Sequence, residues 1–295
     1  MKIRTIAILL LCMVFSMGAS AYQTKKDMER IERLLADAQK LPKDSNLMLH
    51  FGKQFLNVPY VAHTLDLNME EEKLVVNTRE LDCTTFVENV LALTLCAQRG
   101  ETKFTDFENQ LQQIRYRNGK VEYTRRLHYF TLWIEDNARM GYVTKVESQY
   151  MPFTAVQRVK ADYMTKHVKD YAMLAAHPEW LEGIKEMESI ITGNYYRYIP
   201  KKNINNSNIL RQTIKNGDII AILTKKKGLD TSHIGIAVWG KDGLHLMNAS
   251  SIHKKVVIEP MVLQKYMEKH PSQIGIRLCR VVELKKKLVP LHPKR

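Results

Sequence analysis

The hydrophobic pattern of the chain changes period about two thirds of the way along, and this change restricts the fold more than any other feature. Before residue 216, apolar residues recur mostly at helical spacing, and after it short apolar runs alternate with turn residues. An Asp242-Gly243 turn joins two such runs, 233–239 and 244–249, which is a strong hairpin signal. Helices followed by an antiparallel sheet predict an α+β fold.

The same patterns place the individual elements. Strands are predicted at 219–223, 233–239, 244–249, 255–259 and 274–282, with a short additional strand at 73–77. Helices are predicted at 24–38, 47–56, 83–99, 106–115, 127–141, 168–176 and 179–191. Residues 153–162 fit either a strand or a loop.

One predicted helix begins with a single cysteine. Apolar residues follow Cys83 at helical spacing until Gly100 closes the run. Free N–H groups and the helix dipole favour a thiolate at a helix start, so we expect the pKa of Cys83 to lie below the usual value of about 8.5. The alternative is a buried structural cysteine. Cys96, with apolar neighbours in the same helix, fits that alternative better than Cys83, which Asp82 and Thr84 flank.

A cysteine nucleophile requires a base and a group that orients the base. Of the ten histidines, His233 is the best candidate for the base, because it opens a predicted strand after a polar segment. Asn248 lies 15 positions later in the partner strand of the hairpin. Its side-chain oxygen would accept the imidazole N–H and leave the other ring nitrogen for the thiol, the Cys-His-Asn logic of papain-like enzymes. The alternatives are a histidine at a strand edge and a turn-forming asparagine.

The N-terminus has the pattern of a secretory signal. Lys2 and Arg4 precede an apolar run over 6–15 and a small-residue site that ends at Ala21, after which we expect cleavage. A lipoprotein signal would use Cys12, but Leu11 stands where such signals carry a small residue. The later apolar runs are too short to span a membrane. We expect an exported protein, periplasmic in a two-membrane bacterium and otherwise secreted.

Signal removal would leave three cysteines. Cys83 and Cys96 lie 13 positions apart on one predicted helix, about 20 Å, so they cannot be bridged. At most one disulfide, with Cys279, is possible, and the simplest interpretation is a free Cys83.

The chain carries a formal net charge of +14. Basic residues are dispersed and no nucleic-acid-binding motif is visible, so we expect an anionic polymer such as cell wall, or lipid headgroups, rather than nucleic acid. Paired His/Glu ligand spacing is also missing from the sequence, so no metal or cofactor is expected.

Several motifs resemble, in order, those of the NlpC-like superfamily of papain-fold cell-wall peptidases and amidases. They are Leu81-Asp82-Cys83-Thr84-Thr85-Phe86-Val87-Glu88, Asn216-Gly217-Asp218-Ile219-Ile220, Ser232-His233-Ile234-Gly235-Ile236 and Asn248-Ala249-Ser250-Ser251. With Pro59-Tyr60-Val61 and Leu127-His128-Tyr129-Phe130, the chain most resembles the N-acetylmuramoyl-L-alanine amidase-like family. The resemblance runs from about residue 60 to residue 282. It implies a papain-like (NlpC-type) fold, with the cysteine at the N-terminus of a buried helix packed on an antiparallel sheet of about five strands.

The resemblance also implies an activity: cleavage of the amide between N-acetylmuramic acid, including its 1,6-anhydro form, and L-alanine of the stem peptide. Cys83 would attack, His233 would act as base and then acid, and Asn248 would orient the ring. The family usually carries histidine at the position of Asn248.

The same resemblance implies a set of substrate-binding residues. Tyr60 would lie near the oxyanion, Asp82 would face the substrate, and Arg79, His128 and Tyr129 would line the pocket, with Ser232 beside the base. Each has a structural alternative. Asp82 would cap the helix, Tyr129 would be core, and His128 would be a structural hydrogen-bond partner.

Two other functions fit the same residues. One is an endopeptidase that cuts the stem peptide between D-glutamate and the diamino acid, and the other is a non-catalytic cell-wall-binding protein. The predicted organisation is a signal peptide (1–21), an N-terminal helical segment (22–58), a papain-like amidase domain (59–285) and a basic tail (286–295). The expected partners are muropeptides.

Overall fold

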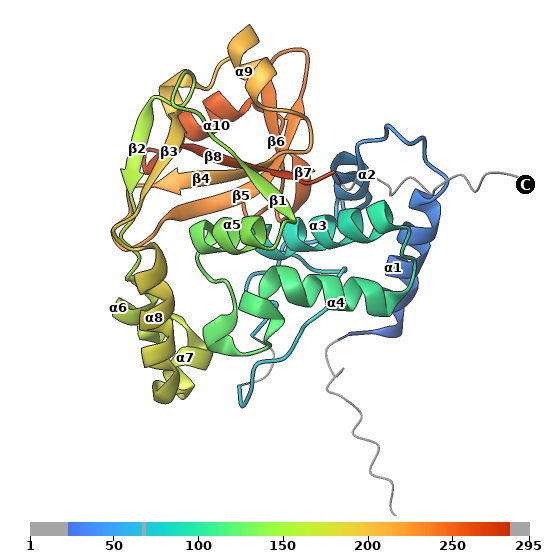
Figure 1. The fold of residues 1–295 in the computed structure, drawn as a ribbon, viewed down its shortest axis with the longest axis vertical. Helices are drawn as coiled ribbons and strands as arrows, with labels where there is room; N and C mark the ends of the chain where they lie inside the picture. Colours follow the sequence, from blue (N-terminus) through green and yellow to red (C-terminus); the bar gives the residue numbers. More distant parts are fainter. Residues whose placement is uncertain (1–22, 67–68, 284–295) are drawn as a thin grey trace, which may run out of the picture.

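The computed structural model describes residues 23–66 and 69–283. The predicted signal peptide and basic tail lie outside these residues. The predicted α+β architecture is confirmed: helices cover both faces of one sheet (Figure 1).

The main helices are α1 (Lys25–Ala38), α2 (Leu47–Gln54), α3 (Cys83–Arg99), α4 (Phe104–Arg115), α5 (Phe130–Arg139), α6 (Tyr163–Lys166), α7 (Ala172–Ala176), α8 (Leu181–Ile191), α9 (Asn208–Thr213) and α10 (Leu263–Glu268). The strands are β1 (Val143–Val146), β2 (Ala155–Arg158), β3 (Tyr195–Pro200), β4 (Ile219–Thr224), β5 (Thr231–Trp239), β6 (Leu244–Ser250), β7 (Lys255–Ile258) and β8 (Gln273–Val281).

The sheet has the order β2-β3-β8-β4-β5-β6-β7, with β1 paired to β8, and neighbouring strands are antiparallel. All five strands predicted after residue 216 are present, and the Asp242-Gly243 turn joins β5 to β6. The prediction of about five strands is nevertheless wrong, because the sheet has eight. The additional strands β1 to β3 lie before residue 216. β1 and β2 are only four residues long, and half of the residues in each are exposed, so they carry little periodic signal.

The predicted strand at 73–77 is also wrong, because this segment is extended without strand pairing. Side chains at the C-terminal end of α4 bind carbonyl groups of this segment instead. Arg115 Nη1 donates to the Val75 carbonyl at 2.6 Å, and the Tyr116 hydroxyl lies 3.2 Å from the carbonyl oxygen of Lys73. A segment whose carbonyl groups are bound by side chains can have the same apolar pattern as a strand, so the sequence did not distinguish the two.

The core has two apolar layers, one on each face of the sheet. Alternate residues of β4 belong to different layers, as strand geometry requires. Helix α3 packs on β5 and β6 in one layer, while α9 and α10 cover the other (Figure 1). Residues 85–96 of α3 are all buried, so α3 is the central helix of the protein.

The N-terminal helices share the core of the rest of the chain. Ile31 and Leu35 of α1 and Phe51 of α2 are fully buried in the same layer as α3. Residues 23–58 therefore pack as part of the layer that supports the cysteine helix.

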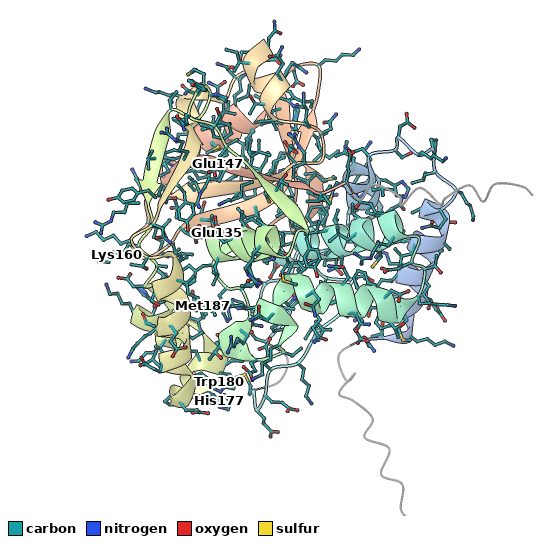
Figure 2. All side chains as sticks on the ribbon, in the orientation of Figure 1. Glu135, Glu147, Lys160, His177, Trp180 and Met187 are labelled. Atoms are coloured by element: carbon teal, nitrogen blue, oxygen red, sulfur yellow. The ribbon has the colours of Figure 1, made fainter. Side chains whose placement is uncertain are left out.

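Helices α6 to α8 lie beside the sheet, below β2 and β3 in Figure 1. An aromatic stack joins them to the body of the molecule. The rings of His177 and Trp180 lie together at the end of this segment in Figure 2, with centroids 3.8 Å apart. Trp180 also stacks on Tyr123, 5.0 Å away. Among the described helices, none has the length and apolar character that a membrane span requires.

Candidate active site

Cys83 is the first residue of α3, as predicted. Asp82 is the N-cap: its Oδ1 accepts a hydrogen bond from the Thr85 backbone at 2.8 Å, and Thr85 Oγ1 accepts one from the Asp82 backbone at 2.9 Å. Gly100 ends the helix with φ +76°, a left-handed conformation that favours glycine. These caps set the start of α3, and hence the position of the Cys83 thiol.

The predicted low pKa of Cys83 is contradicted. Burial of the sulfur raises the pKa of Cys83 to about 12, and the nearby charge of Asp82 adds to this effect. Hydrogen bonds from the Ile234 backbone, the Thr84 side chain and the Cys83 backbone favour the thiolate, but burial outweighs them. The helix start therefore lowers the pKa of Cys83, as expected, but by less than burial raises it. Cys83, Cys96 and Cys279 are all free thiols.

His233 and Asn248 are brought together by the β5–β6 hairpin. His233 Nε2 lies 2.9 Å from Asn248 Oδ1, and the Asn248 side chain is completely buried. Gly235 permits this close approach of the strands, since a Cβ there would lie 2.7 Å from the Met247 carbonyl oxygen. The bond leaves Nδ1 of His233 as the second ring nitrogen.

The cysteine helix meets the histidine strand at Ile234. The backbone of Ile234, the residue after His233, contacts the Cys83 thiol. Within residues 23–66 and 69–283, no hydrogen bond joins the thiol directly to the His233 ring. Catalytic hydrogen bonds frequently tighten only in a substrate complex. Burial lowers the pKa of His233, although the Asn248 bond and the charges of Glu259 and Asp82 oppose it. The Cys83 thiol and the His233 imidazole are therefore both neutral in the free protein.

Tyr60 lies at the same site. Its backbone N–H donates to the Lys254 carbonyl, next to β7, at 2.9 Å, and Tyr60 pairs with Leu81, two residues before the cysteine. Burial raises the pKa of the Tyr60 hydroxyl, and charges on Cys83 and Asp82 raise it further. The Tyr60 hydroxyl therefore stays protonated at neutral pH and keeps a proton to donate.

Arg79 lies on the approach to Cys83 and is held from the N-terminal helix. Its Nε is 3.3 Å from both carboxylate oxygens of Asp27, a residue of α1 that is completely buried, while the Arg79 side chain is 45% exposed. The sequence analysis missed Asp27. The acidic residue three positions after Thr24 has the pattern of a capping box, which does not indicate contacts with a segment about 50 residues away.

The remaining predicted site residues are bonded to partners outside the candidate site. The Tyr129 side chain is buried, and its hydroxyl is occupied by Glu188 and by two backbone N–H groups, so Tyr129 is placed as a core residue. His128 Nε2 lies 2.9 Å from the Tyr123 carbonyl oxygen, and burial lowers the His128 pKa well below its usual value. Ser232 is exposed and its hydroxyl donates to the Ile222 carbonyl at 3.3 Å.

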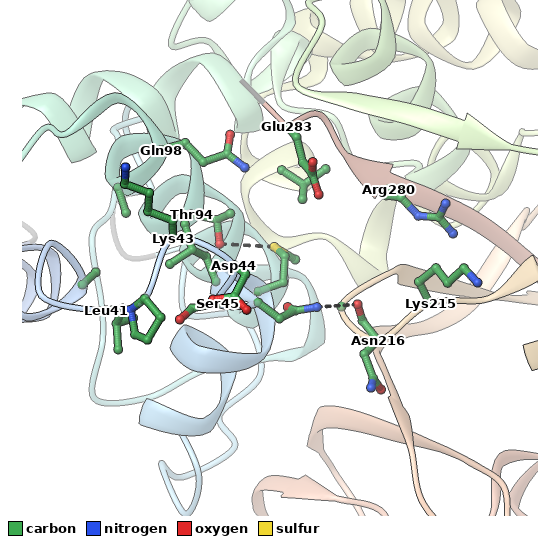
Figure 3. Close-up of a pocket in the computed structure, with 18 of the residues that line it drawn as sticks. Leu41, Lys43, Asp44, Ser45, Thr94, Gln98, Lys215, Asn216, Arg280 and Glu283 are labelled. Carbon is green, nitrogen blue, oxygen red and sulfur yellow. Dashed lines mark hydrogen bonds between the residues drawn. The ribbon is translucent and has the colours of Figure 1, made fainter. Parts of the chain in front are cut away.

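A large cavity lies at the opposite end of α3 from Cys83. It has a volume of about 870 Å³, and Thr94, Lys215 and Arg280 contribute to its lining (Figure 3). Thr94 lies about 16 Å from Cys83 along the helix axis, at 1.5 Å per residue, so this cavity is separate from the candidate site. In the described part of the chain, no three His, Cys, Asp or Glu side chains are grouped to hold a metal ion.

Comparison with known proteins gives consistent matches. The sequence model of a protein family described as N-acetylmuramoyl-L-alanine amidase-like matches residues 50–276. The structure of an N-acetylmuramoyl-L-alanine amidase from Bacteroides uniformis is 39% identical with a TM-score of 0.74, over 83% of this chain and 99% of that one. A Bacteroides fragilis protein described as a candidate xylanase is 40% identical with a TM-score of 0.73, over 79% and 100% of the two chains.

A more distant structure, from Legionella pneumophila, shares the fold alone. It is 21% identical with a TM-score of 0.67, over 87% of this chain and 95% of that one. A search of curated proteins finds no match.

Proposed function

Because the chain belongs to the N-acetylmuramoyl-L-alanine amidase-like family, we propose that it hydrolyses the amide bond between N-acetylmuramic acid and the L-alanine of the peptidoglycan stem peptide. The observation that carries the proposal is the bond between His233 and Asn248, 2.9 Å long, on the strand that meets the first residue of α3. A cysteine, a histidine and an orienting amide at one place are the components of thiol-dependent amide cleavage.

The proposed reaction begins from the neutral pair. Asn248 Oδ1 accepts the Nε2–H of His233, so the lone pair of Nδ1 takes the thiol proton of Cys83 as the sulfur attacks the lactyl carbonyl carbon. The tetrahedral oxyanion would be stabilised by the Cys83 backbone N–H and the Tyr60 hydroxyl. His233 then gives the proton to the departing L-alanine nitrogen, which leaves a thioester between Cys83 and the sugar. Water, deprotonated by His233, hydrolyses this thioester and restores the thiol.

The raised pKa of Cys83 and the lowered pKa of His233 determine what substrate binding must accomplish. A thiol of pKa about 12 beside a histidine of lowered pKa does not form a stable ion pair in the free protein. Proton transfer is therefore coupled to attack, and the oxyanion donors act where charge develops. We place Asp82 near the substrate because it caps the helix immediately before Cys83, and Arg79 because it lies four positions before Cys83, held by Asp27.

The rest of the predicted organisation belongs to the same proposal. The order of a cysteine helix followed by a sheet that carries His233 and Asn248 supports the papain-like (NlpC-type) arrangement for residues 59–285. A cell-wall substrate supports export, with the signal peptide at 1–21. Muropeptides, with or without the 1,6-anhydro ring, are the proposed substrates.

The test is mass spectrometry of the products after incubation of the mature chain with anhydro and non-anhydro muropeptides. We expect free sugar and a peptide that begins at L-alanine from the wild type and from the matched variant Cys96→Ala on the same helix, and no product from Cys83→Ala. A cut between D-glutamate and the diamino acid would replace the amidase by an endopeptidase. Turnover by Cys83→Ala would refute the thiol mechanism, and release of sugars from xylan would favour a glycosidase.

A further inference from the structure

A buried carboxylate lies behind Asn248, on the side away from His233. Glu259 follows β7 and is 1% exposed. Its Oε1 accepts a hydrogen bond from Asn248 Nδ2 at 3.2 Å, and its Oε2 lies 3.1 Å from Nε2 of His253, a residue of the β6–β7 turn. A chain of contacts thus runs from His233 through Asn248 and Glu259 to His253.

The contacts of Asn248 fix which way its amide faces. Nδ2 is bounded by two acceptors, the Leu246 carbonyl at 3.3 Å and Glu259 Oε1. A rotated amide would place Oδ1 against both of these oxygens and lose two hydrogen bonds in a fully buried position, which is costly. Oδ1 is therefore held toward His233.

The direction of the amide in turn fixes the histidine. An oxygen at 2.9 Å from Nε2 requires that Nε2 carry the proton, because two acceptors cannot share a hydrogen bond. The neutral ring then has its lone pair on Nδ1. We infer that Glu259 is a positioning residue, which holds the amide of Asn248 and through it the tautomer of His233 that the proposed function requires.

The charge of Glu259 has a second, separable effect on His233. The charged groups that face His233 are Glu259 and Asp82, and both raise the pKa of His233 against the effect of burial. Removing the Glu259 charge while keeping a hydrogen-bond acceptor should therefore make His233 less basic without changing its tautomer. Removing both the charge and the hydrogen-bond acceptor should also leave the Asn248 amide free to rotate. Two variants, Glu259→Gln and Glu259→Met, separate these contributions.

The kinetic experiment compares both variants with the wild type on a muropeptide substrate. Activity requires neutral His233, so a lowered pKa of His233 should move the acid limb of kcat/KM to lower pH in Glu259→Gln, with KM unchanged. Glu259→Met should in addition lower kcat in proportion to the fraction of His233 in the wrong tautomer, toward a limit of about 10⁴-fold where that tautomer predominates. The matched control is Glu188→Gln, a carboxylate that is 4% exposed and accepts hydrogen bonds from Tyr129 and Thr165 elsewhere in the core.

A spectroscopic readout separates failure of this inference from failure of the proposed function. ¹⁵N NMR of the full chain reports the tautomer and pKa of His233 without any substrate. We expect the Nε2–H form in the wild type and in Glu259→Gln, and a mixture of tautomers in Glu259→Met. Wild-type tautomer, titration and kcat in Glu259→Met, or an equal loss in Glu188→Gln, would overturn the inference. If Glu259→Met does not fold, an unshifted His233 titration in Glu259→Gln would overturn the inference.

Discussion

The buried carboxylate of Asp27 offers a quantitative test of how the N-terminal helix supports the candidate site. Asp27 Oδ1 accepts hydrogen bonds from the Thr78 backbone at 2.9 Å and from the Thr78 hydroxyl at 2.7 Å, and Oδ2 accepts two more from Thr24. The residues that it holds, Thr78 and Arg79, lie five and four positions before Cys83. Asp27→Ala would remove every one of these contacts.

The loss of stability expected for Asp27→Ala depends on which of these hydrogen-bond donors water can reach. Thr24 is partly exposed and can be hydrated, whereas Thr78 is 1% exposed, so its two donors would be left without a partner. A buried unsatisfied donor costs about 1–3 kcal/mol, which gives about 3 kcal/mol for the pair. For a chain of this size that corresponds to a fall in melting temperature of about 5 °C.

The assay is urea unfolding and thermal melting at neutral pH, beside Asp37→Ala, an exposed carboxylate on the same helix whose partner is Lys40. Asp37→Ala should change the free energy of unfolding little. Burial alone would raise the pKa of Asp27, but the bonds from Thr24 and Thr78 lower it overall. The contribution of Asp27 should therefore be present at neutral pH and be lost in acid, as pH falls from about 4 through the folded pKa. Equal stability of the two variants would refute the reasoning.

Two further predictions concern the thiol and the hairpin. Alkylation of native Cys83 by iodoacetamide should accelerate about tenfold per pH unit up to its pKa of about 12, because only the thiolate reacts. Buried Cys96 and Cys279 should remain unlabelled, as peptide mapping would report, and a rate that levels off near pH 8 would contradict the raised pKa. Gly235→Ala should lower kcat and stability, because the new Cβ would lie 2.7 Å from the Met247 carbonyl and force β5 from β6. Circular dichroism melting and activity measurements would report this effect, and an unchanged His233–Asn248 pair by NMR would count against it.

The raised pKa of Cys83 also bears on how a free thiol would persist after the proposed export. Oxidation and disulfide exchange proceed through the thiolate. At neutral pH, a thiol of pKa about 12 is almost entirely protonated. A neutral resting thiol therefore suits the proposed function in an oxidising compartment better than a preformed thiolate does.

Features determined by near neighbours in the chain were predictable from the sequence. The start of α3 depends on Asp82 and Thr85, its end depends on Gly100, and the β5–β6 hairpin depends on a short turn. The hairpin also brought His233 and Asn248 together, because two strands joined by a turn fix the distance between their residues. These are local effects, in which residues a few positions apart satisfy one another.

The tertiary structure decided everything that depends on what packs against a residue. The pKa of Cys83 rises because other segments cover its sulfur, and burial outweighs the helix terminus. Asp27 reaches Arg79 across 52 positions, and Glu259 reaches Asn248 from the end of the neighbouring strand β7. Strands β1 to β3 and the extended segment at 73–77 likewise obtain their partners from distant parts of the chain. Desolvation and long-range hydrogen bonds depend on three-dimensional neighbours, which the local pattern of a sequence does not specify.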